Sequence, residues 1–193
     1  EIIKIGNPNP DFTLGLDKNF TYKNFVLNLL VDGRFGGEMV SASDAIMAAD
    51  GTPAYTKSYR EPGSWLLPAV LENGSKNTTP IDAETFWTSV SGTQAWSEEF
   101  VYDATNVRLR EFSVGYRFNK FLGTFIKEAK LSFVARNVFY LYRGFAKVDL
   151  PGIDKRKAWF DSEVNLFNSN LQGLEYGTLP PTRSIGLNLK LSF

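Results

Sequence analysis

The sequence predicts an all-β protein, in which an antiparallel sheet forms a segment of a transmembrane β-barrel. Two observations lead to this prediction. Apolar and polar residues alternate in five segments, which is the period-two pattern of strands with one apolar face. Short and long connections also alternate between those segments, as periplasmic turns and extracellular loops do in outer-membrane barrels.

Five strands are expected, each close to the roughly 9–11 residues that a tilted membrane strand needs. The alternation slips in phase at Glu111, and a β-bulge would absorb that slip. The expected strands cover residues about 11–22, 24–35, 105–118, 129–139 and 183–193. In the last strand the apolar side chains that we expect to face lipid and to serve barrel assembly are Ile185, Leu187, Leu189, Leu191 and Phe193.

The connections predict how the sheet is oriented. Residues 22–24 and 119–128 form short links, whereas residues about 36–104 and 141–181 form two long loops. The order of strands places both long loops on one side, which we interpret as extracellular. Since about eight strands are the minimum for a closed barrel, the chain must be a segment of a larger barrel or assemble in copies.

The composition excludes several functions. The chain has no Cys and no His, so Ser-His-Asp and Cys-His catalysis and Cys/His zinc sites are excluded. Twenty-one basic residues balance 21 acidic ones, which argues against a nucleic-acid partner. The acidic groups at Glu98, Glu99 and Asp103 and at Asp161 and Glu163 lack the spacing of a calcium loop, so we interpret them as solvated charges. We therefore expect no enzymatic activity, no metal and no cofactor.

Other residues allow two interpretations each. Trp65, Trp87, Trp96 and Trp159 lie in the long connections, where their rings could stack on a sugar substrate or instead pack the loops or an interfacial belt. The run Asp154–Lys157 is interpreted as a solvated surface patch, with contact to lipopolysaccharide phosphates or to a partner protein as the alternative. Cations on the polar side of the strands are expected to point to the barrel interior, where they could line the path of a substrate or contact a plug; they are Arg108, Arg110, Arg117, Arg136 and Lys190.

Several blocks along the chain resemble the C-terminal barrel of SusC/RagA-like TonB-linked outer-membrane proteins of Bacteroidota, and they occur in the order that this family shows. Where family members commonly have Asp-Pro-Glu, this sequence has Asp161-Ser162-Glu163. The matching blocks are residues 5–12, 22–25, 32–37, 107–116, 135–139, 170–177 and 180–193.

The resemblance implies the last five strands of a barrel of about 22 strands with a plugged lumen. It also implies a transporter in the bacterial outer membrane that works with TonB and a SusD-like surface lipoprotein and imports oligosaccharides or peptides. The plug, the TonB-contacting segment and the signal peptide are then expected outside this chain. Two alternatives stay open: a siderophore or cobalamin receptor of the TonB-dependent type, and a soluble β-rich carbohydrate-binding module.

Overall fold

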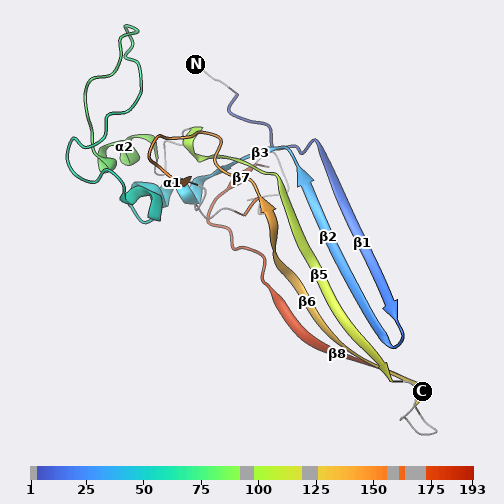
Figure 1. Cartoon of the computed structure of the whole chain (residues 1–193). Helices are drawn as coiled ribbons and strands as arrows, with labels where there is room; N and C mark the ends of the chain where they lie inside the picture. The colour runs from blue at the N-terminus through green and yellow to red at the C-terminus, as the bar shows by residue number, and fades with distance from the viewer. Residues whose placement is uncertain (1–3, 92–97, 119–125, 156–160, 164–172) are drawn as a thin grey trace. The chain divides into compact units, whose positions relative to one another are not determined.

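The computed structural model describes residues 4–91, 98–118, 126–155, 161–163 and 173–193. The chain divides into two compact units. We call residues 10–36, 105–143 and 180–193 the sheet unit, and residues 1–9, 37–104 and 144–179 the loop unit. The described residues are mostly β-sheet with few helices (Figure 1).

The sheet unit is one antiparallel sheet with strand order β1-β2-β5-β6-β8. Figure 1 shows these strands side by side, from blue β1 to red β8. The strand expected at 129–139 continues further, because residues up to Arg143 keep pairing with the start of β5. The bounds are β1 Phe12–Tyr22, β2 Phe25–Phe35, β5 Asn106–Phe118, β6 Glu128–Arg143 and β8 Ser184–Ser192.

The pairing register places apolar side chains on one face of all five strands. A typical row crosses the sheet through Phe20, Leu27, Val114, Phe133 and Leu187. All paired residues of this face are aliphatic or aromatic except Lys18 and Gly33. The opposite face is mostly polar. One face of the sheet therefore suits an apolar environment and the other suits water.

The β-bulge predicted at Glu111 is confirmed, with Arg110 as the extra residue. Val31 pairs with Leu109 and Leu30 pairs with Glu111, so Arg110 has no partner in β2. On the other side Leu109 pairs with Phe139 and Glu111 with Arg136, which leaves Asn137 and Val138 to bulge in β6. Asn137 takes the left-handed conformation, with φ of 51°. The bulge returns the residues on both sides of it to their faces.

The loop unit contains secondary structure where the sequence analysis expects only long loops. Eight-residue helices and two- to four-residue strands are too short for their periodicity to be recognised in sequence. A small sheet has the order β4-β3-β7, in which β3 runs antiparallel to β4 and parallel to β7. The elements are β3 Glu38–Ser41, α1 Ala42–Ala49, η1 Ala54–Lys57, α2 Ala83–Val90, η2 Glu98–Phe100, β4 Val101–Asp103 and β7 Leu174–Glu175.

A side chain caps the N-terminus of each of the helices α1 and α2. The Ser41 hydroxyl accepts a hydrogen bond from the Asp44 amide, and the Asp82 carboxylate accepts one from the Thr85 amide. Neither α1 nor α2 is long enough to cross a membrane, and the described residues contain no other helix that could do so. An aromatic core forms against these helices around Trp65, Trp87 and Phe100.

Removing Arg110 tests the role of the bulge. Without this extra residue the alternation of β5 runs unbroken from Val107 to Phe118, so both halves of the strand keep their faces. We expect the deletion variant of the parent protein to reach the membrane fraction in an amount similar to that of Arg110→Ala, the matched control that keeps the extra residue and also lacks the ion pair with Asp32. An amount far below that of Arg110→Ala would contradict this role of the bulge.

Candidate functional site

Every strand of the sheet unit exposes large apolar side chains on the apolar face. In β8 the side chains of Ile185, Leu187 and Leu189 are 66%, 75% and 61% exposed, and Phe193 beyond the strand is 72% exposed. In the inner strand β6, Phe133 is 41% exposed. Scattered exposed apolar residues are ordinary, but a continuous exposed face marks a surface that something apolar covers.

The polar face carries a paired network in its middle. Arg110 Nε donates to Asp32 Oδ2 at 2.7 Å, and Arg136 Nε donates to Glu111 Oε2 at 2.9 Å. The bulge therefore has a second effect, since it turns the Arg110 side chain toward the carboxylate on β2. Nearer the short turn, Asn28 donates to Ser113 Oγ at 2.9 Å and accepts from Asn19. These contacts pair the charges in the middle of the polar face.

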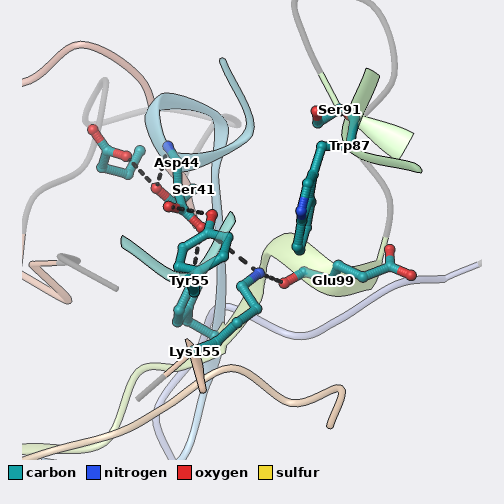
Figure 2. Close-up of polar contacts among 9 residues, drawn as sticks. Ser41, Asp44, Tyr55, Trp87, Ser91, Glu99 and Lys155 are labelled. Atoms are coloured by element: carbon teal, nitrogen blue, oxygen red, sulfur yellow. Dashed lines mark hydrogen bonds and ion pairs between the residues drawn. The ribbon is translucent and has the colours of Figure 1, made fainter. Parts of the chain in front are cut away.

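The loop unit buries an ion pair between Lys155 and Asp44 (Figure 2). Lys155 Nζ lies 3.7 Å from Asp44 Oδ2, and the two side chains are 4% and 1% exposed. The ammonium also donates to the backbone carbonyl of Glu99. These contacts join α1, the segment before β4 and the residues after β6, which are distant in sequence.

Four aromatic rings surround the Lys155 ammonium. Nζ lies 4.3 Å from the ring centroid of Phe100, 5.2 Å from Tyr55, 5.4 Å from Tyr102 and 5.8 Å from Trp87. Ring faces attract a cation electrostatically, and more strongly when the cation is withdrawn from water. The rings therefore offset part of the free energy that burial of the ammonium costs.

Hydrogen bonds hold the Asp44 carboxylate in place. Tyr55 donates to Oδ1 at 2.8 Å and Tyr102 donates to Oδ2 at 2.5 Å. The cap at Ser41 fixes the backbone of the same turn, and the Ser41 hydroxyl in turn donates to Glu175 Oε2 at 2.6 Å. The cluster thus links α1 to β7 as well as to the aromatic core.

Burial perturbs two groups of this cluster. Desolvation lowers the pKa of Lys155 to about 8, although the negative charge of Asp44 partly opposes the shift. Desolvation also raises the pKa of Tyr55 far above its usual range, and the neighbouring Asp44 charge adds to the effect. At neutral pH the lysine is charged and the tyrosine is neutral, which is a stable donor–acceptor set with no nucleophile or general base poised for catalysis.

The tryptophans that the sequence analysis considers as substrate platforms divide into two groups. Trp65 and Trp87 are each 2% exposed and pack against Phe86 at centroid distances of 4.7 and 5.0 Å. In this structure neither ring offers a face for stacking on a sugar, and their positions favour the alternative of packing the loops. Trp96 and Trp159 lie outside the described residues.

The basic run at residues 154–157 differs in burial from what the sequence analysis expects. Lys155, expected in a solvated patch, is instead buried, whereas Asp154 beside it is exposed. Arg156 and Lys157 lie outside the described residues. No signal in the sequence marks Lys155, because its partners Asp44, Tyr55 and Tyr102 are brought to it by the fold. Within the described ranges no group of acidic side chains is arranged to hold a metal ion.

Comparison with known proteins gives a consistent set of similarities. No protein-family model matches the chain. The chain is 28% identical over 191 residues to the TonB-dependent receptor P3 of Formosa agariphila, which covers 98% of this chain and 17% of that receptor. The chain therefore spans about a sixth of its relative's length.

Two solved structures show the same fold. They are the RagAB peptide importer in its closed-closed and open-open states, each with a TM-score of 0.57 and 17% identity. Each match covers 96% of this chain and 17% of the other. The resemblance to a segment of a SusC/RagA-like TonB-dependent transporter is thereby confirmed.

Removal of either charge tests the buried ion pair. Asp44→Asn leaves the Lys155 ammonium buried without its counter-charge and is expected to cost about 3–5 kcal/mol of local stability. Lys155→Met is expected to cost less, because desolvation of the ammonium outweighs its attraction to Asp44. The double variant removes both charges and should cost less than the sum of the single changes. Hydrogen-exchange protection of α1 in the parent protein measures these costs, and additive losses would contradict the coupling.

The stability of the loop unit should rise between pH 8 and pH 10. In this range unfolded Lys155, with its ordinary pKa of 10.5, keeps a proton that the folded residue loses, so unfolding becomes less favourable as pH rises. The expected gain is about 2 kcal/mol. Above about pH 10, ionisation of Tyr55 in the unfolded state opposes this gain in stability.

The difference between wild type and Lys155→Met isolates the lysine contribution. Hydrogen-exchange protection of α1, corrected for the intrinsic pH dependence of exchange, is the measurement. A wild-type profile parallel to that of Lys155→Met from pH 8 to 10 would refute the assignment.

Proposed function

We propose that the chain forms part of the wall of an energy-coupled importer in the bacterial outer membrane. Its five long strands would belong to a larger closed barrel, with the apolar face in lipid and the polar face toward the lumen. The continuous apolar face of the sheet unit is the observation that supports this proposal most directly. Covering each large apolar side chain of that face contributes about 1.5–3 kcal/mol, which a membrane provides across all five strands at once.

The edges of the sheet support a segment of a larger barrel. β1 and β8 each pair with one neighbour among the described strands, and both present a second edge of backbone donors and acceptors. Inside lipid those groups must be paired, and further strands of a barrel would pair them. The relative's greater length is consistent with such strands being supplied by the same polypeptide.

The similarities support the proposed transport activity. One relative is named a TonB-dependent receptor and the solved structures are of a peptide importer. We propose that the parent protein takes up oligosaccharides or peptides, receives energy through TonB and works with a SusD-like lipoprotein. A soluble binding module is less favoured, because it would bury the face formed by Leu187 and its neighbours, which is exposed here.

Adjacent residues of β6 give a matched test. Phe133 lies on the apolar face and Ser132 on the polar face of the same strand. Each is changed to Cys in a parent protein without other cysteines, labelled with a fluorophore and placed in bilayers that contain nitroxide lipids. We expect strong quenching at Phe133→Cys and little at Ser132→Cys; equal quenching at the two sites would sink the proposed orientation.

Uptake assays in bacterial cells test the importing activity of the parent protein. Cells that produce the parent protein should accumulate labelled oligosaccharides or peptides, and inactivation of TonB should abolish this accumulation. Accumulation that persists without TonB would contradict energy-coupled import even if the quenching result holds.

A further inference from the structure

Three cations lie in neighbouring paired positions on the polar face, near the end of the sheet where the turn between β1 and β2 lies. Arg117 of β5 pairs with Lys130 of β6, and Lys130 pairs with Lys190 of β8. Directly paired side chains have Cβ atoms about 4.5–5.5 Å apart, and like charges at that spacing are destabilising. We call these three residues the cationic row.

Charge within the sheet unit does not balance the cationic row. Glu128 is the nearest carboxylate, with Oε1 3.8 Å from Arg117 Nε, and both side chains are about half exposed. The next row inward contains Gly115, Ser132 and Asn188, which carry no charge. Two positive charges are therefore left over among the described residues of this region.

The other carboxylates of the polar face either pair with other cations or lie far from the cationic row. Asp32 and Glu111 are paired with Arg110 and Arg136. Asp17 lies on the edge strand β1, in a row that runs through Leu30 to Glu111. A counter-charge for the row must come from outside the described residues.

The row also borders a cavity of about 240 Å³, lined by its three cations together with Glu128 and Ser192. Lys130 leans over Gly115, where an added Cβ would lie 2.6 Å from Lys130 Cε. The absence of a side chain at Gly115 thus lets the lysine stem lie along the sheet. This leaves a recess of the size of a few side-chain atoms above the row.

We propose that the cationic row docks a carboxylate-bearing segment of the parent polypeptide that lies outside residues 1–193. The inference rests on the proposed function, in which the polar face points to the interior of a barrel. The chain spans 17% of its relative's length, so a parent protein of the relative's length would have many further residues to supply that segment. The repulsion in the row acts at all times, so a permanent segment of the protein neutralises it better than a transient solute.

Zero-length cross-linking of the full-length protein in membranes tests this docking. A carbodiimide joins a lysine amine to a carboxylate only where the two are in contact, and peptide mass spectrometry identifies the pair. We expect Lys130 or Lys190 to be joined to an Asp or Glu outside residues 1–193. Lys147, whose Nζ lies 3.1 Å from Glu38 Oε1, is the internal positive control.

Matched variants separate docking from folding. Lys130→Gln with Lys190→Gln should remove these cross-links while the Lys147–Glu38 cross-link and the quenching at Phe133→Cys persist. Changing the captured carboxylate to Lys in a Lys130→Glu, Lys190→Glu protein should restore the membrane-inserted amount that the double charge reversal lowers.

Four outcomes would overturn the proposal. The first is cross-linking of the row to Glu128 alone, and the second is no cross-link from the row while the Lys147 control forms. The third is cross-linking to a separate protein, which would identify a different partner. The fourth is loss of lysine reactivity only when phosphate is added, which would identify a free anion. Since the quenching test is independent, each of these outcomes can be told from failure of the proposed function.

Discussion

The sheet unit depends on keeping a period of two in register across five strands. Side chains alternate between faces, so an error of one residue in any strand would place its apolar residues in water and its charges on the apolar side. β5 contains such an extra residue, Arg110, and the bulge there confines the error to one position. The same residue then pairs with Asp32, so the correction of register also supplies a cation to the polar face.

The loop unit is held together by a different kind of interaction. Its helices and strands are short, and its apolar core encloses a buried ion pair. Burying Lys155 and Asp44 is unfavourable in itself, and four rings, two tyrosine hydroxyls and a carbonyl compensate for it. Such a cluster has few alternative arrangements, which suits segments that are far apart in sequence and have little regular structure.

The structure of the sheet unit can be predicted from the sequence to a greater extent than that of the loop unit. Alternation in segments such as Ile185–Phe193 is local, so the ranges expected for the strands and the observed bounds lie within a few residues except at the end of β6. The bulge could also be predicted from the sequence, because a slip of phase at Glu111 is visible along one strand. The burial of Lys155 could not be predicted, because an isolated basic run gives no sign that Asp44 and four rings will enclose one of its members.

The sequence by itself determined the all-β class, the two faces of each strand and the position of the bulge, because each of these follows from the spacing of neighbouring residues. Only the tertiary structure decided that Trp65 and Trp87 are core residues, that Lys155 is buried, and that Arg117, Lys130 and Lys190 lie in one row. Those features depend on which distant segments meet. Pairing between strands and packing of rings set these contacts, and neither is encoded in the pattern of any single segment.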